Sequence, residues 1–184
     1  LGDGAFSPHT RPLTDLGNSE RFADLKIGQL RYVFGLDQWI RRNGICWESA
    51  GTILEDLKLV SRSIVSEALA NADEGRRASL LKHAINSESQ AKLAAMRSLA
   101  EQTAVLQVMA EALDRMSHLL GTPSGVVDLR KGALVESTPD QWITMQTAVG
   151  FDPEATCPRW EQFIAEIMGG DQLMMYFLKV LFGS

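Results

Sequence analysis

The sequence predicts an α+β fold that is mostly α-helical, with about six to seven helices and two small antiparallel β-hairpin or meander elements. Apolar residues recur at helical spacing through most of the segment from Thr52 to Leu113. The dipeptide Asn43-Gly44 and the segment Arg130-Lys131-Gly132 each separate two short β-type runs. Helical periodicity combined with two isolated turn signals favours helices packed around small sheets.

The N-terminal part begins with a polar segment and continues with a helix. Residues 1–12 contain Gly and Pro and are predicted to be a flexible lead-in. Asn18 is a good N-cap residue, so we expect a first helix from Ser19 to Ile27. The segment 13–184 is predicted to form a single domain.

The first β region extends from Leu30 to Glu48, with a preceding strand at Leu30–Phe34 that completes a small meander. Asn-Gly is the strongest signal for a two-residue hairpin turn because both turn positions must tolerate positive φ. A turn at Asn43-Gly44 would place Arg42 opposite Ile45 and Ile40 opposite Trp47.

Strand alternation then assigns side chains to the two faces of this hairpin. One face is predicted to point to the core and carries three apolar residues: Ile40, Ile45 and Trp47. The other face carries Trp39 and Arg41.

A helical region follows. Helices are predicted over Thr52–Ala70, from Asp73 through Ile85, from Ser87 through Glu101 and over Thr103–Leu113. Thr52 with Glu55, and Ser87 with Gln90, have the spacing of capping boxes, and Asp73 is a single N-cap.

The C-terminal third is predicted to contain a second hairpin and two helices. Val126–Leu129 pairs with Ala133–Val135 across the Arg130-Lys131-Gly132 turn. Pro158 is suited to the first position of a helix, and Asp171 caps the last helix. The residues expected to be buried on these two helices are Trp160, Phe163, Ile164, Ile167, Leu173, Phe177, Val180 and Leu181.

Composition restricts the class of protein. The chain has 184 residues, of which 45% are hydrophobic and 22% charged, so it can bury a core of ordinary size. The net charge is -5 and the isoelectric point is about 5.2. A basic footprint over the whole chain is therefore absent, and any contact with nucleic acid must be local.

The metal-ligating residue types are scattered. Cys46 and Cys157 lie far apart, as do His9, His83 and His118, so no zinc site is predicted and the cysteines are expected to be free thiols. We expect no cofactor. No apolar run approaches the roughly 20 residues of a membrane span, and no signal peptide is visible, so a cytoplasmic location is the expectation.

No catalytic site is predicted. The glycines of Gly121–Gly125 are followed by Val126 and Val127, whereas a phosphate loop needs Lys and Ser or Thr there. Carboxylate pairs such as Glu55-Asp56 are expected to lie at helix starts, where the exposed amides attract them. His118 has no nucleophile that the sequence would place beside it.

Six residues are candidates for contact with nucleic acid: Arg31, Trp39, Arg41, Arg42, Arg130 and Lys131. Basic and aromatic side chains on a small sheet can hold a single strand through phosphate contacts and base stacking. The alternative for the first hairpin is a solvated surface with Trp47 packed inward. The alternative for Arg130 and Lys131 is an ordinary charged turn.

Several motifs together resemble one family. The first two motifs are Leu13-Thr14-Asp15-Leu16-Gly17-Asn18 followed by Glu20-Arg21-Phe22, and Leu30-Arg31-Tyr32-Val33 followed by Trp39, Gly44 and Trp47. The next two are Leu119-Leu120 followed by the run from Gly125 to Gly132, and Asp152-Pro153 through Trp160 followed by Phe163. The last two are Gly169-Gly170-Asp171 and Phe177-Leu178-Lys179-Val180-Leu181. In this order they resemble the domain that precedes the helicase in phage and plasmid primase-helicases, with poxvirus primase-helicases as distant relatives. Two local departures are Gly121, where the family usually has Asn, and Phe182-Gly183, where it has Gly-Tyr.

The resemblance implies a non-catalytic module of a DNA primase-helicase that couples the primase to a superfamily-3 helicase motor and assists ring assembly or DNA positioning. The implied partners are single-stranded DNA, bound weakly, the protein's own helicase and primase domains, and further copies of the protein. Two alternatives belong to other classes: a stand-alone nucleic-acid-binding protein of a mobile element, and a small enzyme with an unrecognised site. A phosphate loop in the same gene would distinguish the module from the stand-alone protein.

Overall fold

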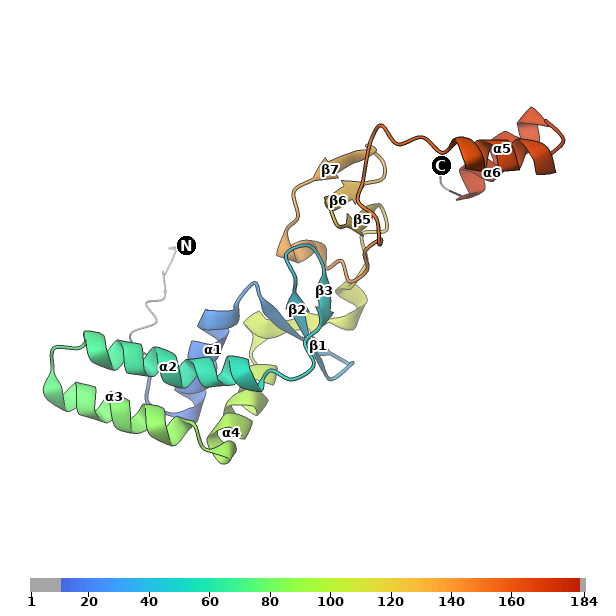
Figure 1. The fold of residues 1–184 in the computed structure, drawn as a ribbon. Coiled ribbons are helices and arrows are strands. Elements are labelled where there is room, and N and C mark those ends of the chain that lie inside the picture. Colours follow the sequence, from blue (N-terminus) through green and yellow to red (C-terminus); the bar gives the residue numbers. More distant parts are fainter. Residues whose placement is uncertain (1–10, 183–184) are drawn as a thin grey trace, which may run out of the picture. The chain divides into compact units, whose positions relative to one another are not determined.

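The computed structural model describes residues 11–182, and these fall into two compact units, 1–151 and 152–184 (Figure 1). Each unit is described by itself. Most of the predicted lead-in, residues 1–10, lies outside the described residues. The single domain over 13–184 stays a prediction.

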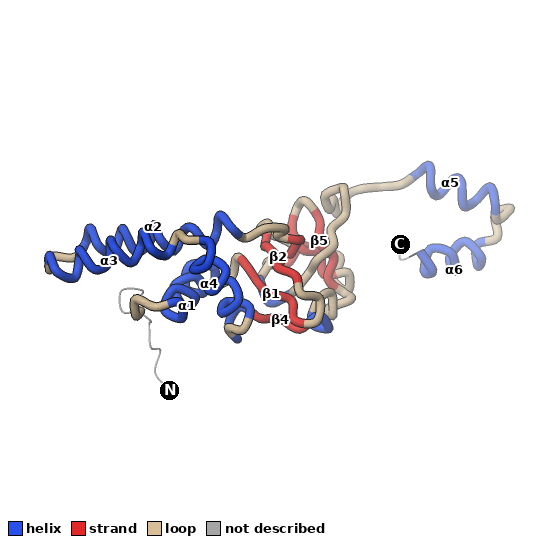
Figure 2. Tube along the Cα trace, turned by 90° about the horizontal axis from the view of Figure 1, so that it is seen from below, coloured by secondary structure: helices blue, strands red, loops and turns tan. Residues whose placement is uncertain are grey.

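Within residues 11–151, the first unit contains four α-helices and two sheets (Figure 2). The helices are α1 (Asp15–Lys26), α2 (Leu54–Ala70), α3 (Glu74–Ser87) and α4 (Gln90–Glu101). Helix α2 packs against α3, and α1 packs against α4. Their apolar faces enclose the largest core cluster, whose most deeply buried members are Phe22, Leu30, Val60, Ile64, Ala68, Leu80, Met96, Ala100 and Leu106. The α+β class predicted from the sequence is confirmed.

The ends of the helices differ from three of the predictions. Helix α1 begins at Asp15, because the Thr14 side chain accepts a hydrogen bond from the Gly17 amide at 3.1 Å, and Asn18 is buried inside the helix rather than capping it. The predicted capping boxes are also wrong. The α2 N-cap is Ile53, without a side-chain bond, and Ser87 is the last residue of α3. The Asp73 cap is confirmed, since its carboxylate accepts the Arg76 amide at 2.7 Å.

The first sheet has four strands in the order β3-β2-β1-β4. They are β1 (Leu30–Phe34), β2 (Gln38–Arg42), β3 (Trp47–Ser49) and β4 (Gln107–Met109). The first three strands form the predicted meander. Strand β4 pairs with β1 in parallel, with Val108 beside Val33, so the helix predicted over Thr103–Leu113 is wrong. Short 3-10 turns flank β4 instead.

The hairpin between β2 and β3 has a different register from the predicted one. Arg42 pairs with Trp47 and Ile40 with Ser49, which leaves four residues in the loop instead of two. The Asn43 carboxamide oxygen accepts the amides of Ile45 and Cys46, and this wider Asx turn replaces the tight turn. A shift of two residues preserves alternation, so Ile40 and Trp47 still share a core cluster, but Ile45 leaves the strand.

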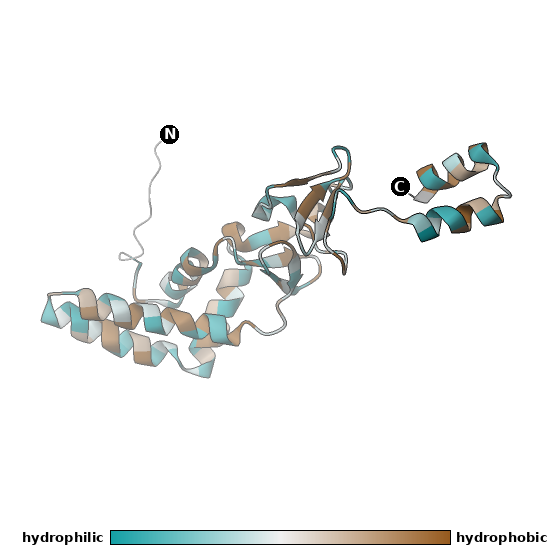
Figure 3. Ribbon diagram, turned by 45° about the horizontal axis from the view of Figure 1, so that its top comes forward, coloured by the Kyte–Doolittle hydropathy of each residue, from teal (hydrophilic) through white to brown (hydrophobic). Residues whose placement is uncertain are grey.

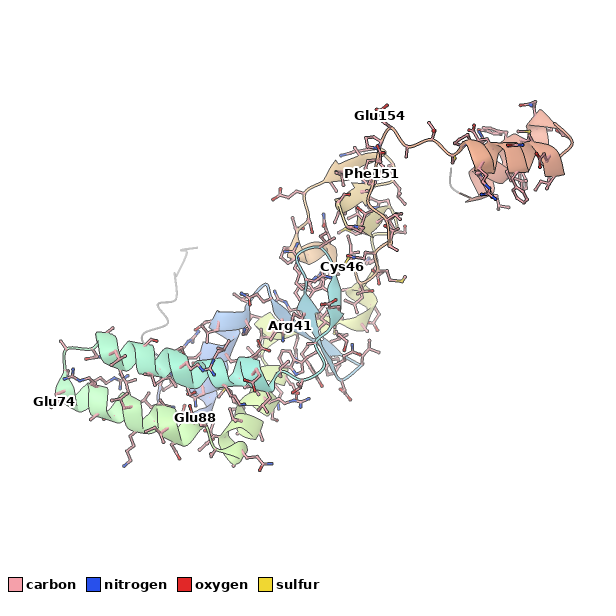
Figure 4. All side chains as sticks on the ribbon, in the orientation of Figure 1. Arg41, Cys46, Glu74, Glu88, Phe151 and Glu154 are labelled. Carbon is pink, nitrogen blue, oxygen red and sulfur yellow. The ribbon has the colours of Figure 1, made fainter. Side chains whose placement is uncertain are left out.

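The second sheet has three antiparallel strands in the order β5-β6-β7: β5 (Leu119–Thr122), β6 (Gly125–Asp128) and β7 (Ala133–Val135). The predicted pairing of β6 with β7 is confirmed, and β5 was not predicted. Cys46, from the loop before β3, packs with Val126 and Ile143 in a small cluster that joins the two sheets. Figure 4 labels Cys46 and Arg41 in this part of the unit.

The second unit contains α5 (Pro158–Ile167) and α6 (Gln172–Phe182). Pro158 is the first residue of α5, and Asp171 accepts the Leu173 and Met174 amides, as predicted. Both helices carry hydrophobic and hydrophilic residues (Figure 3). Ile164 is buried, but Phe163 is 49% exposed and Leu173 is 80% exposed.

Burial in the second unit is therefore less extensive than predicted. Trp160 is only partly buried, and its ring lies 6.0 Å from that of Phe163. The prediction that Trp160 and Phe163 are core residues is wrong for this structure, as it is for the remaining residues of the predicted buried set: Ile167, Leu173, Phe177, Val180 and Leu181. Two helices alone offer each other too little surface to cover both apolar faces.

Candidate nucleic-acid interface

Trp39 is part of the core and not of an exposed surface. Trp39 is 3% exposed, and its ring packs edge-on against Phe22 with 5.9 Å between the ring centroids. The indole Nε1 donates to Glu101 Oε1 at 3.2 Å. A base can stack only on an accessible ring face. This placement corrects the expectation that Trp39 shares an open face with Arg41.

Arg31 packs on two tryptophan rings. Its guanidinium carbon lies 5.7 Å from the Trp47 ring centroid and 5.8 Å from that of Trp142, and the two rings stack at 5.3 Å. Burial lowers the pKa of Arg31, and the nearby Asp140 carboxylate opposes this effect. Sequence reasoning missed Trp142, because it lies outside every predicted element and about a hundred residues from its partners.

Arg41 takes part in an ion cluster. It donates to Asp56 at 2.6 and 3.3 Å, and Lys26 Nζ lies 2.8 Å from the same carboxylate. Burial acts to raise the pKa of Asp56, but the hydrogen bonds from Arg41 and Lys26 outweigh it and lower that pKa below its ordinary value. These ion pairs join α1, β2 and the start of α2, so Arg41 has a structural role.

Arg42 is also held inside the first unit. Its Nη2 donates to the carbonyl oxygen and to the hydroxyl of Ser137, both at 2.9 Å. The Ser137 hydroxyl donates in turn to the carbonyl oxygen of Gly44 at 3.4 Å. Arg42 therefore ties the β2–β3 hairpin to the segment that follows β7.

Arg130 and Lys131 remain exposed. They lie in the turn between β6 and β7, with 65% and 68% of their side chains exposed. Arg130 Nε and Nη2 donate to the two oxygens of the buried Asp128, at 3.1 and 3.0 Å, and Lys131 Nζ lies 4.0 Å from the same group. The hydrogen bond from the Arg130 side chain is the main cause that lowers the pKa of Asp128 to about 2.

The six predicted residues are thus not one surface. Arg31, Arg41 and Arg42 all lie on the first sheet, and each is engaged within the protein: Arg31 with tryptophan rings, Arg41 with a carboxylate and Arg42 with a carbonyl oxygen. Arg130 and Lys131 belong to the second sheet and keep most of their surface. The structure leaves the β6–β7 turn as the accessible candidate.

Other places in the described chain offer little chemistry. A groove of about 470 Å³ lies between the start of α2 and α4, and its lining includes the apolar Ile53, Leu57 and Leu93 and the charged Lys58, Glu88 and Arg97. Within residues 11–182, no group of three or more His, Cys, Asp and Glu side chains is arranged to hold a metal ion. Cys46 is buried and Cys157 is exposed, and both are free thiols. No helix of the described part could cross a membrane.

Polar residues at the start of α1 are used to hold the helices together. Asn18 Oδ1 lies 2.9 Å from His83 Nε2, and the Asn18 carboxamide donates to the Ser87 hydroxyl at 2.8 Å. Arg21, 3% exposed, pairs with Glu67 at 3.0 Å. These contacts leave neither residue available to a ligand.

The family model described as D5 N terminal like matches residues 19–169. The chain belongs to this family. No curated protein matches the chain. The D5 N terminal like family is a non-catalytic domain found with D5-like primase-helicases, so the chain carries an N-terminal module of that class of protein.

The match to the D5 N terminal like family spans both units described above. It runs from within α1, through both sheets, to the end of α5. The ion pair of Arg21 with Glu67, the ring contacts of Arg31 and the contact of Asp128 with Arg130 lie within the matched range. In this D5 N terminal like chain, these three motif residues make contacts that hold the fold together.

Proposed function

We propose that this chain is the module of a DNA primase-helicase that couples a primase to a superfamily-3 helicase motor and assists ring assembly or the positioning of DNA. The observation that carries the proposal is the family match over residues 19–169. It agrees with the structure, in which the motif residues Asn18, Arg21 and Asp128 are engaged in internal contacts. A module of this kind acts by holding other parts in place.

In the proposed role the chain neither binds nor hydrolyses ATP. The segment Gly121–Gly125 supports this expectation, since it forms the end of β5, a tight turn and the start of β6, not a loop before a helix. Phosphate loops hold nucleotides with the amides at such a helix start and with a following lysine. Coupling would then act on a motor located elsewhere in the protein.

The test uses the natural gene product that contains this chain. We expect its reading frame to encode a phosphate-loop ATPase, and we expect removal of this module to leave ATP hydrolysis while ring formation and DNA unwinding fall. Unwinding at an unchanged rate without the module would contradict the proposed role. A reading frame without any nucleotide-binding motor would favour the stand-alone nucleic-acid-binding protein.

A further inference from the structure

Two segments meet at one end of the second sheet. Leu119, the first residue of β5, pairs with Asp128, the last residue of β6, and the Leu129 amide donates to the His118 carbonyl oxygen at 2.8 Å. The Leu119 amide also donates to the Met116 carbonyl oxygen, which folds the segment before β5 into a tight turn. His118 therefore lies beside Leu129 at this end of the sheet, and Arg115 directly precedes the turn that leads into β5.

This end of the sheet carries three exposed basic side chains, Arg115, Arg130 and Lys131, which we call the basic tip. Within the described residues, Arg115 has no ion pair. The carboxylate of the neighbouring Asp114 is engaged with Thr144. Asp128 pairs with Arg130 and Lys131, and Asp114 adjoins Arg115 in the sequence, so the three positive charges of the basic tip exceed these two negative charges by one in a chain whose net charge is -5.

Asp128 orients part of the basic tip. Its two oxygens accept Nε and Nη2 of Arg130, and one of them also accepts the Arg130 amide at 3.0 Å. Because a guanidinium has five N–H donors in a rigid plane, the donors not used on Asp128 remain available on the exposed side. Arg130 is thus presented to solvent in a fixed orientation, which reduces the entropy lost when it binds an anion.

We propose that the basic tip binds the phosphate backbone of nucleic acid, without preference for sequence. This inference rests on the proposed function, which brings DNA to the protein, and it names the surface that DNA contacts. The segments 115–118 and 129–132 contain no Phe, Tyr or Trp, so the contact is made to phosphates rather than by base stacking. The proposed contact with nucleic acid therefore lies on the second sheet and not on the first, where the arginines are engaged in internal contacts.

The experiment measures the affinity of the 184-residue chain for a fluorescent oligo-dT strand by anisotropy, at a series of salt concentrations. The test variant combines Arg115→Gln, Arg130→Gln and Lys131→Gln. The control variant removes the same charge from the exposed Arg62 and Lys82 and the half-buried Arg77 on α2 and α3, with Arg62→Gln, Arg77→Gln and Lys82→Gln. Circular dichroism confirms that both variants fold.

We expect the test variant to bind at least about tenfold more weakly at low salt. The slope of log affinity against log salt should fall in magnitude by about 2, because each phosphate contact on a single strand contributes about 0.7. The control variant should keep most of the affinity and slope of the parent chain. Equal losses in the two variants would mean that only total charge matters and would overturn the inference.

Two further arms identify the ligand. A duplex of the same length distinguishes single from double strands as the source of phosphates, and binding of either one through the basic tip supports the inference. A poly-glutamate peptide that binds as tightly as the oligonucleotide would overturn it in favour of an acidic protein partner. Absence of DNA binding by the parent chain would also overturn it, while the coupling role would still be decided by the unwinding assay.

Discussion

Asn18 and His83 are 65 residues apart in the sequence and share a partly buried hydrogen bond of 2.9 Å between Oδ1 and Nε2. The same Asn18 carboxamide donates to Ser87, so one side chain of α1 binds two residues of α3. Burial is the main cause that lowers the pKa of His83, and Arg21 and Lys92 act in the same direction. The contact explains why an Asn is useful inside a helix, where it is otherwise a weak helix former.

Replacing Asn18 with Ala should lower the free energy of unfolding by about 1–3 kcal/mol, since the half-buried His83 and the buried Ser87 would each lose a hydrogen bond. Urea denaturation followed by tryptophan fluorescence measures the change. Asn86→Ala is the matched control, because Asn86 is exposed on the same helix as His83. Similar effects of the two substitutions would show that the Asn18 network adds no stability.

Replacing Trp39 with Ala should cost about 3–5 kcal/mol, the range for a large aromatic residue removed from a core. Trp160→Ala should cost clearly less in the same urea experiment, because Trp160 is only partly buried and lies in the smaller unit. A small loss for Trp39→Ala, below about 1 kcal/mol, would mean that its ring is not a core element and would restore it as a stacking candidate.

Gly121→Ala should destabilise the chain by about 1–3 kcal/mol through overpacking. A Cβ at this position would lie 2.6 Å from the Met145 carbonyl oxygen and 2.7 Å from Cys46 Sγ. Because the Met145 contact is with backbone, adding Cys46→Ala should not restore full stability. Gly75→Ala, near the start of α3, serves as the control and should cost clearly less, because the nearest atom to its Cβ would be the side-chain oxygen Asp73 Oδ1, at 3.3 Å.

Stability should fall in acid partly through Asp128. Its pKa in the folded chain is about 2, below the ordinary value of 3.8, mainly because Arg130 donates to the carboxylate. The unfolded chain therefore takes up the proton first, so the stabilisation is present above about pH 4 and is lost as the pH falls toward 2. Urea midpoints at pH 5, 4 and 3 should decline less steeply for Asp128→Asn than for the parent. Parallel declines would assign the acid sensitivity to other groups, such as Asp56.

Capping and turn residues in the sequence correctly predicted three helix starts and one β-turn. Asp73, Pro158 and Asp171 occupy the helix starts where their side chains indicated, and the turn at Arg130-Lys131-Gly132 joins the expected strands. Each of these depends on hydrogen bonds or backbone angles within a few residues. The sequence alone contains that information.

Features that depend on distant partners were not predictable. The segment around Val108 has helical composition, yet it forms a strand because β1 offers an edge and Val33 a buried neighbour. The turn at Asn43 is wider than predicted because the Asn43 carboxamide oxygen accepts the Cys46 amide. The Trp47 amide donates to the carbonyl oxygen of Ile143, which lies far along the chain. The internal contacts of Arg41 and Arg42 likewise depend on Asp56 and Ser137, which no local pattern connects to them.

The arginines of the first sheet hold the fold together, whereas the basic tip is the surface that we propose to contact nucleic acid. The most direct measurement is an oligo-dT titration of Arg41→Gln and Lys131→Gln, with the urea midpoint of each. The expected result is that Arg41→Gln unfolds at lower urea with its affinity unchanged within about twofold, whereas Lys131→Gln keeps its midpoint and binds roughly three- to fivefold more weakly at low salt. The opposite pattern, with affinity lost in Arg41→Gln and stability unchanged, would contradict the claim.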